Sequence, residues 1–469
     1  MSSQVRITGV ALWFLPVTTR VPLKFGTEAL TEVTCARVRM TVEDSSGRTA
    51  AGWGETPLSV QWVWPSASPY AVRLGALRLF TRMLARAWGQ YSDVAHPLRL
   101  GTDFNDLLLP RLCEDFNASG LAPATDPLPR LAALVCSSPF DLALHDAFGR
   151  LHGISPFDAC RAPWLDEPLT AFLSAESASD PVLAGRSVST PFLAGPRRRL
   201  EAWHLVGGLD PLQAEELTGK EPQDGIPVLL ADWIRKDGLT CLKVKLRGND
   251  ADWDFRRLAE VGRIGGALGV TAYTADFNCT VRDPAYVCDV LDRLERDHPA
   301  IHRALLYVEQ PFPYDLESHP IDVREVSRRK PLYLDESAHD WRIVELGRGL
   351  GWTGVALKNC KTFSGAVLSA GWAHAHGMGL MVQDLTNPML AQVPHVQLAA
   401  NLPTLLGVET NAMQFYPAAS DPEARVHPGL YRRRDGCVDL STLDSHGFGM
   451  AGAEAARELG EPVEARGRG

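Results

Sequence analysis

From about residue 200 onward, the sequence repeats a short apolar strand, a loop and an amphipathic helix. The candidate strands are LEAWHLV, TCLKVKL, VTAYTADFN, RALLYVEQP, PLYLDES, TGVALKN, MGLMVQD and LLGVETN, and helical stretches such as ADWDFRRLAEVGRIGGALG lie between most of them. This alternation predicts parallel βα units, and a closed (β/α)8 barrel of the TIM type fits the chain up to residue 417. A doubly wound open sheet is the alternative, but no GxGxxG or GxxxxGK[ST] loop supports nucleotide binding.

The N-terminal part has a different pattern. Residues 1–62 carry alternating, β-branched segments, and the SSG of CARVRMTVEDSSGRTAAGWGET predicts a turn between antiparallel strands. Residues 69–152 show apolar residues at helical spacing. Residues 160–200 are rich in Pro, Gly and Ser and predict a long surface excursion. We therefore predict an α+β domain over 1–155, an irregular insertion or linker over 156–199, the barrel over 200–417 and a C-terminal segment over 418–469.

Charge and composition narrow the class of partner. The net charge is −9 and the isoelectric point is near 5.8, so the chain offers no basic field for nucleic acid or for anionic lipid. The start of the chain lacks the pattern of a signal peptide, and no run approaches 18 apolar residues. The nine cysteines form no CxxC pair. These observations predict a cytoplasmic protein with reduced thiols that binds neither nucleic acid nor membrane.

Polar residues recur where the predicted barrel strands end. Side chains alternate along a strand, so Lys243 and Lys245 share one face of CLKVKL. The next four strands end, in chain order, at Asp276-Phe-Asn278, at Glu309-Gln-Pro, at Asp335-Glu336-Ser and at Lys358. A single Asp or Asn at such a place commonly caps a helix or makes a turn. Five strands in register favour a site at the mouth of the barrel, where the chemistry of such barrels is found.

The chemistry of this set points to a metal-assisted reaction. Three carboxylates, Asp276, Glu309 and Asp335, with no Cys or His among them, suit a hard, oxygen-seeking ion such as Mg²⁺. Lysines from the second and sixth strands flank the three carboxylates on opposite sides of the mouth. A substrate on the metal would therefore have an amine or an ammonium on each face.

The motif set KxK, DxN, EQP and DES, followed by Lys358, resembles the enolase superfamily and, within it, the muconate-lactonizing-enzyme subgroup of the mandelate racemase/muconate lactonizing enzyme family. PFDLALHDAFGRLHGISPFDA resembles the end of that family's N-terminal capping domain, and RRRDGCVDLSTLDSHGFGM resembles the return of the chain to that domain. The resemblance implies a modified TIM barrel behind an α+β capping domain. It also implies a small-molecule carboxylate substrate, and we expect a homo-oligomer.

Carried over residue by residue, the resemblance assigns roles. Asp276, Glu309 and Asp335 match the Mg²⁺ ligands. Lys245 and Lys358 match acid/base groups on the two faces of the substrate, and Lys243 would support the substrate carboxylate or Lys245. MVQD at the end of the seventh strand lacks the catalytic His of the mandelate-racemase pattern. Relatives commonly have a Glu-Ser type sequence there, and Asp384 is the candidate replacement.

The implied reaction begins with removal of the proton α to a carboxylate. Two opposed lysines favour racemisation or epimerisation. The alternatives are β-elimination, as in a dehydratase or o-succinylbenzoate synthase, and cycloisomerisation; a catalytically silent metal-binding barrel is the alternative of another class. Specificity in this family comes from capping-domain loops, which points to PLKFGTEAL and to GWGETPL, whose Gly-rich turns would let backbone approach the substrate. We predict substrate contacts by Phe25, Asn278 and Asp384; the alternative for these loops is a hairpin without a ligand.

Overall fold

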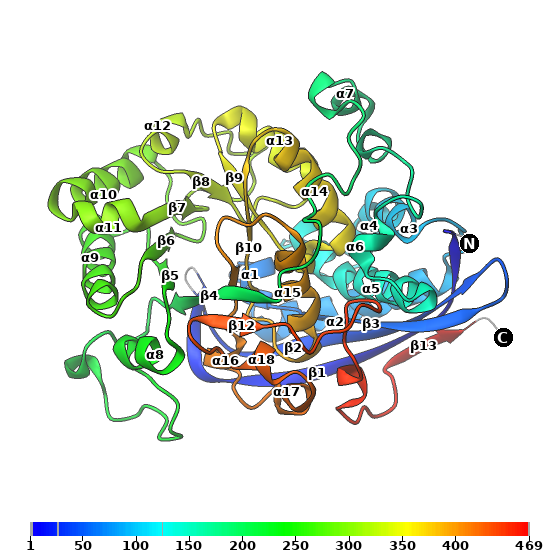
Figure 1. Cartoon of the computed structure of the whole chain (residues 1–469), viewed down its shortest axis with the longest axis horizontal. Coiled ribbons are helices and arrows are strands. Elements are labelled where there is room, and N and C mark those ends of the chain that lie inside the picture. Colours follow the sequence, from blue (N-terminus) through cyan, green and yellow to red (C-terminus); the bar gives the residue numbers. More distant parts are fainter. Residues whose placement is uncertain (1–2, 26–27, 124, 468–469) are drawn as a thin grey trace.

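The computed structural model describes residues 3–25, 28–123 and 125–467. In its middle lies a curled sheet of parallel strands that pair in the order β10-β9-β8-β7-β6-β5-β4-β11 (Figure 1). The backbone N–H of Leu405, just ahead of β11, donates to the carbonyl of Leu380 in β10 (2.8 Å), so the two ends of the sheet meet. These strands are β4 (Arg199–Val206), β5 (Cys241–Lys245), β6 (Ala272–Asp276), β7 (Leu305–Glu309), β8 (Leu332–Leu334), β9 (Gly354–Leu357), β10 (Gly379–Val382) and β11 (Val408–Glu409). The barrel-type α/β fold and all of its predicted strands are confirmed.

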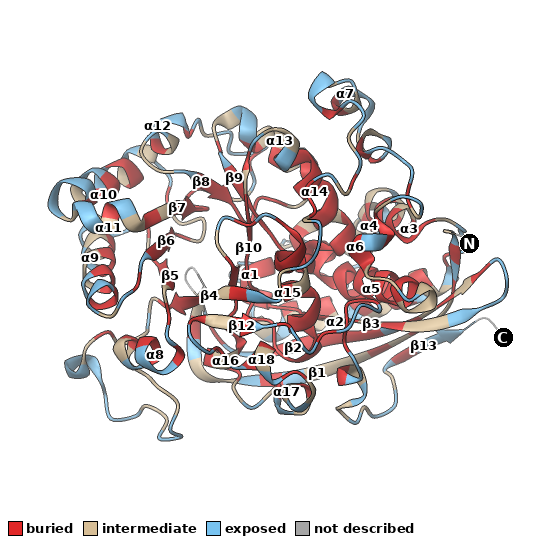
Figure 2. Ribbon diagram, in the orientation of Figure 1, coloured by how far each residue is buried: buried red, intermediate tan, exposed pale blue. Residues whose placement is uncertain are grey.

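Helices cover the outside of the curled sheet, and their inward faces are buried while their outward faces are exposed (Figure 2). Several begin at an aspartate whose side chain accepts a backbone N–H of the first turn: Asp250 from Trp253, Asp283 from Ala285 and Asp340 from Arg342. Such caps end the preceding loop sharply and help to keep each βα unit compact. The helices are α8 (Leu230–Asp237), α9 (Ala251–Ala267), α10 (Pro284–Asp297), α11 (Pro299–Ala304), α12 (Arg324–Ser327), α13 (Trp341–Leu350), α14 (Phe363–Ala375) and α15 (Gln392–Asn401).

Large side chains fill the interior of the barrel below its mouth. The buried layer consists of Trp203, Cys241, Ala272, Tyr307, Tyr333 and Met381. The rings of Tyr307 and Tyr333 stack with centroids 4.2 Å apart. A Cβ on Gly354 would lie 2.2 Å from the Tyr333 ring, so the glycine makes room for that ring. On β5 the inward positions run from Cys241 in this layer to Lys243 and Lys245 above it, which explains why two lysines share one face of a core strand.

The N-terminal part forms a separate antiparallel sheet with the order β13-β1-β2-β3, next to the barrel (Figure 1). Its strands are β1 (Val5–Phe25), β2 (Glu28–Asp44), β3 (Thr49–Pro57) and β13 (Glu464–Gly467). The predicted turn between β2 and β3 is confirmed. The helices of this part are α1 (Val60–Val63), α2 (Tyr70–Gln90), α3 (Pro97–Asp103), the π-helix η1 (Phe104–Leu108), α4 (Leu109–Ala118) and α5 (Arg130–His152).

The glycines of GWGETPL have a structural role, and the prediction that they form turns admitting backbone to the substrate is wrong. Gly52 and Gly54 lie inside β3, against α5. A Cβ on Gly52 would lie 2.0 Å from the backbone nitrogen of Ala147, and a Cβ on Gly54 would lie 2.1 Å from the carbonyl oxygen of Pro139. The glycines therefore allow a helix to pack directly on the strand.

Residues 153–198 contain short helices: α6 (Pro156–Ala159), the 3-10 helix η2 (Leu169–Phe172), α7 (Ala175–Ala178) and the 3-10 helix η3 (Pro181–Leu183). Only part of this segment is the surface excursion that its composition predicts, with α7 standing at the periphery (Figure 1). Leu169 and Leu183 are fully buried, and the space beside Gly371 of α14 is taken by Leu169. The segment thus covers part of the barrel's helical layer.

After β11 the chain returns to the N-terminal sheet through α16 (Ala412–Phe415), α17 (Asp421–Val426), α18 (Pro428–Tyr431), β12 (Cys437–Asp439), which pairs with β4, and the 3-10 helix η7 (Ala453–Ala455). Arg37 of β2 is buried and pairs with Glu55 of β3 and with Glu423 of α17 (3.0 Å). The remaining short helices are η4 (Ala214–Glu216), η5 (Asn359–Lys361) and η6 (Met389–Ala391). The domain boundaries given above stay predictions. No helix in the described ranges is long and apolar enough to cross a bilayer.

Candidate active site

Three buried carboxylates stand at the ends of neighbouring barrel strands. Asp276 ends β6, Glu309 ends β7 and Asp335 follows β8 directly. Their exposed fractions are 0%, 0% and 1%. The strand register pairs Lys245 with Asp276 and Asp276 with Glu309, so these residues lie at one level of the barrel.

Lys243 lies among these carboxylates. Its Nζ is 2.7 Å from Glu309 Oε1, 3.1 Å from Asp276 Oδ2 and 3.2 Å from Glu409 Oε2 of β11. Burial lowers the pKa of Lys243, but the surrounding carboxylates outweigh this effect and hold the pKa well above its ordinary value. Lys243 is therefore a fixed positive charge.

Lys245 and Lys358 stand on different sides of the group. Lys245 Nζ donates to Asp276 Oδ2 and to Asn278 Oδ1 (2.9 Å). Lys358 follows β9, and its Nζ donates to Asp335 Oδ2 (2.8 Å). Because β5 and β9 are four places apart in a ring of parallel strands, the two lysines approach the mouth from opposite sides. Both are buried.

The three carboxylates at the strand ends form a group that suits a cation. Within the described part of the chain, no three His, Cys, Asp or Glu side chains are arranged to hold an ion as they stand, since Lys243 lies between the carboxylates. However, Oδ1 of Asp335 is buried without a hydrogen-bond partner. Burial, followed by the charges of Asp276 and Asp335, raises the pKa of Glu309 well above its ordinary value. An all-oxygen donor set of three carboxylates fits Mg²⁺.

Besides Glu409, the sequence reasoning missed Lys361 and Trp62, which border this group. Lys361 is buried and donates to the backbone carbonyl of Asp335. Trp62 of α1 comes from the N-terminal part, and its ring centroid lies 4.7 Å from Lys358 Nζ. Lys361 follows Lys358 by three residues, a spacing that could have drawn attention. Nothing in the sequence indicates that Trp62 lies over the barrel mouth.

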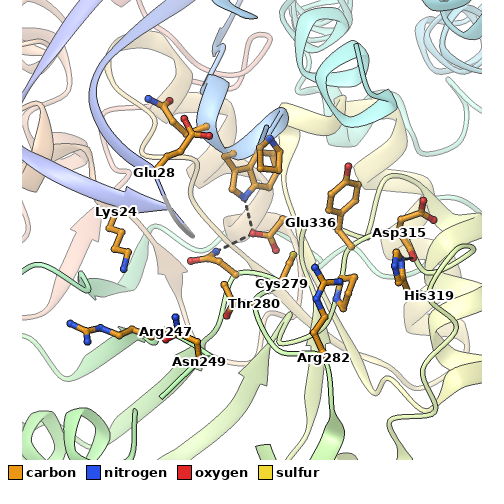
Figure 3. Close-up of a pocket in the computed structure, with 16 residues that line it drawn as sticks. Lys24, Glu28, Arg247, Asn249, Cys279, Thr280, Arg282, Asp315, His319 and Glu336 are labelled. Carbon is orange, nitrogen blue, oxygen red and sulfur yellow. Dashed lines mark hydrogen bonds between the residues drawn. The ribbon is translucent and has the colours of Figure 1, made fainter. Parts of the chain in front are cut away.

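Glu336 is turned toward a neighbouring cavity. Its Oε1 accepts from Trp62 Nε1 (3.0 Å) and from Asn278 Nδ2 (3.0 Å), and Figure 3 shows both bonds. Asn278 has a positive φ of 45°, and its side chain joins Lys245 to Glu336. The loop after β6 is thus fixed by the site itself.

The other two predicted substrate residues differ in what the structure describes. Asp384 is buried, and its carboxylate accepts backbone N–H bonds from Asn387 (2.8 Å) and Asn411 (2.6 Å). It therefore stabilises two loops beside Lys243 and Glu409. Phe25 ends β1, but its side chain lies outside the described residues, as does Gly26.

A cavity of about 630 Å³ opens beside the lysine–carboxylate group (Figure 3). Trp62, Asn278 and Glu336 form the boundary between the two. The rest of its lining comes from both parts of the chain: Lys24, Glu28, Gln61 and Pro65 from the N-terminal part, and Arg247, Asn249, Cys279, Thr280, Arg282, Pro313, Tyr314, Asp315 and His319 from the barrel loops. Such a volume is ample for a small organic substrate.

Comparison with known proteins decides the family. Residues 228–456 match the family model for the enolase C-terminal domain-like region of mandelate racemase and muconate lactonizing enzyme. Residues 228–456 therefore belong to the enolase superfamily. No curated protein matches this chain in a sequence search.

Solved structures of the superfamily share the fold over nearly the whole chain. A dipeptide epimerase from Cytophaga hutchinsonii, complexed with Mg and the dipeptide D-Ala-L-Val, has a TM-score of 0.61 at 16% identity and covers 95% of each chain. An N-succinyl Arg/Lys racemase from Bacillus cereus ATCC 14579 has 0.61 at 16%, over 98% of this chain and 99% of its own. Muconate lactonizing enzyme from Pseudomonas fluorescens, complexed with muconolactone, has 0.57 at 15%, over 95% and 96%. At these identities the likeness concerns the fold.

Proposed function

We propose that this enolase-superfamily protein is a Mg²⁺-dependent racemase or epimerase. It removes the proton α to the carboxylate of a small substrate and returns a proton to the opposite face. Lys245 and Lys358 are the two acid/base residues, and Asp276, Glu309 and Asp335 would hold the ion.

The observation that carries this proposal is the placement of the two lysines. They come from β5 and from the end of β9, on opposite sides of the ring of strands, and each is bonded to a different carboxylate of the trio. A planar intermediate lying over that trio would present one face to each lysine. A single-base reaction needs no such symmetry.

The residues of the site have different roles in the proposed reaction. A bound Mg²⁺ would stabilise the negative charge that develops on the substrate carboxylate as the α-proton leaves. Lys243, held protonated by three carboxylates, adds a fixed positive charge beside it. Burial lowers the pKa of Lys358, but Asp335 outweighs burial and raises it, so Lys358 rests as a proton donor. Trp62 and the buried walls exclude water from both lysines.

The similar structures are consistent with racemisation but do not distinguish it from the other reactions. Two of the structures above are named an epimerase and a racemase, and the third is a muconate lactonizing enzyme. Cycloisomerisation and β-elimination take place on the same kind of site, so the product formed from a substrate distinguishes these reactions from racemisation.

The test is a screen in D₂O with Mg²⁺ present. Dipeptides, N-acyl amino acids, acid sugars and succinylbenzoate precursors are incubated with the protein, and deuterium at the α-carbon is read by NMR or mass spectrometry. We expect deuterium uptake together with inversion at that carbon for at least one class. Uptake followed by loss of a β-group or by ring closure would replace racemisation with the alternatives, and no uptake from any class would contradict the proposal.

A further inference from the structure

The cavity beside the site carries three cationic side chains without an acidic partner among the described residues. Lys24 of β1, Arg247 after β5 and Arg282 after β6 all line it. None of the three side chains forms a hydrogen bond or an ion pair with any residue in the described ranges. In Figure 3, Lys24 and Arg247 lie on one side of Glu336 and Arg282 lies on the other.

The acidic residues of the same cavity are engaged elsewhere. Both carboxylate oxygens of Glu28 accept from Arg73 (2.9 and 2.6 Å). Asp315 accepts from the backbone N–H and the hydroxyl of Ser318 (2.9 and 2.8 Å). Glu336 accepts from Trp62 and from Asn278, as described above. The cations thus lack the partners that acids of the cavity could have supplied.

The guanidinium of Arg247 is oriented by the Trp253 ring and has an unsatisfied N–H group. Its guanidinium carbon lies 3.9 Å from the centre of the Trp253 ring, and its Nε is buried without a hydrogen-bond partner. Stacking on a ring fixes the plane of a guanidinium, so less freedom is lost when the group binds a carboxylate through two N–H bonds. A buried N–H without a partner costs free energy unless a ligand or water bonds to it.

We infer that the substrate is a dianion: beyond the reacting carboxylate it carries a second anionic group, a carboxylate on a flexible tail, which binds Arg247 with Lys24 on the same side of the cavity. The inference rests on the proposed function for the position of the reacting end. Asn278 and Glu336 line this cavity, and Asn278 bonds to Lys245, so a tail that begins between the catalytic lysines would reach the cations through the same space. N-succinyl or N-glutaryl amino acids and dipeptides with an acidic residue have this chemistry.

The test compares charged compounds with neutral compounds of the same shape. Binding to the intact protein with Mg²⁺ is measured by calorimetry for N-succinyl and N-succinamoyl derivatives of a panel of amino acids, and for Ala-Glu and Ala-Gln. A charge-assisted contact of this kind should make the charged member of at least one pair bind about 10- to 100-fold tighter. A panel in which no charged member binds tighter than its amide would overturn the inference.

Variants tie the preference to the named residues. Arg247→Gln, Lys24→Gln and the double variant should each reduce the charged-to-neutral affinity ratio, the double variant to about 1. Arg263→Gln is the control, because that arginine is 63% exposed on α9 and pairs with Glu260 of the same helix. Thermal melts establish that each variant is folded. A ratio that persists in the folded double variant would contradict the inference.

The two proposals fail separately. The affinity ratio tests the anionic tail without any turnover, whereas deuterium uptake at the α-carbon of the bound compounds tests the proposed reaction. Tight charge-dependent binding without uptake would refute the reaction alone, and uptake with no charge preference would refute the anionic tail alone.

Discussion

Replacing Lys243 with Met should destabilise the protein strongly, and Mg²⁺ should reverse much of the loss. The side chain is 3% exposed, and its Nζ lies within 3.2 Å of three carboxylates, on Asp276, Glu309 and Glu409. Methionine fills similar volume but leaves those charges without their nearest cation. Removing one partner of a buried ion pair costs about 3–5 kcal/mol, so in EDTA at pH 8 the free energy of unfolding should fall by about that amount.

An added divalent cation should reduce the difference in the free energy of unfolding between the variant and the unmodified protein. A ligand that binds only the native state stabilises it by about 2.7 kcal/mol at 100 times its Kd. Because the variant no longer has an ammonium competing for the same carboxylates, its stabilisation by Mg²⁺ should exceed that of the unmodified protein. Denaturant unfolding with EDTA and with Mg²⁺ measures both quantities, and Lys220→Met, at an exposed position, is the control. Equal free energies of unfolding of the variant and the unmodified protein in EDTA, or equal stabilisation of both by Mg²⁺, would show that Lys243 does not offset the charge of these carboxylates.

Three further predictions follow from single features. Asp276→Asn, Glu309→Gln and Asp335→Asn should each weaken Mg²⁺ binding in calorimetry by at least about tenfold; undiminished affinity in all three would show that the ion binds elsewhere. Burial lowers the pKa of His96 from 6.5 to about 4, and its Nδ1 must stay unprotonated to accept the N–H of Leu98. Between pH 6.5 and 4 the folded state therefore binds fewer protons than the unfolded state. The stability that His96 contributes above pH 6.5 is lost as the pH falls toward 4, and the total loss is about 3 kcal/mol. His96→Asn keeps an N-cap acceptor and should flatten that part of the pH profile in denaturant titrations; an unchanged profile would contradict the assignment. Gly52→Ala should lower the free energy of unfolding by about 1–3 kcal/mol, since its Cβ meets the backbone of α5, while Gly75→Ala in α2, with open space around it, should raise stability by about 0.5–1 kcal/mol; similar effects of both would count against the close packing of β3 on α5.

The sequence predicted the barrel because the information is local. Each βα unit shows its strand as an apolar run and its helix as a 3.6-residue period, and the polar residue that ends each strand stands at the mouth in any parallel barrel. Hence Lys245, Asp276 and Glu309 could be placed side by side before the register was known. Glu409 ends the last strand in the same way and could have been found by the same reasoning.

What the sequence could not predict depends on contacts between distant segments. Trp62 lies over the barrel mouth only because α5 of the N-terminal part packs on the loop after β9, where Ser138 donates to the carbonyl of Asn359 (2.6 Å). The glycines of β3 look like turn residues until the helix that they admit is in place. Glu336 follows Asp335 in sequence but turns to the neighbouring cavity, where it accepts from Asn278 of the loop after β6 and from Trp62 of the N-terminal part.

The stereochemistry of deuterium uptake in two single variants decides whether Lys245 and Lys358 act as bases on opposite faces of the substrate. Lys245→Ala and Lys358→Ala should both abolish racemisation of a turned-over substrate, because each lacks a proton donor or acceptor on one face. Each should still exchange the α-proton of the enantiomer that faces its remaining lysine. The lost exchange should fall by about 10²- to 10⁴-fold, the usual contribution of a general base. We expect complementary patterns, with one enantiomer exchanged by each variant in D₂O with Mg²⁺. Exchange of both enantiomers by either variant would contradict the assignment of two opposed lysine bases.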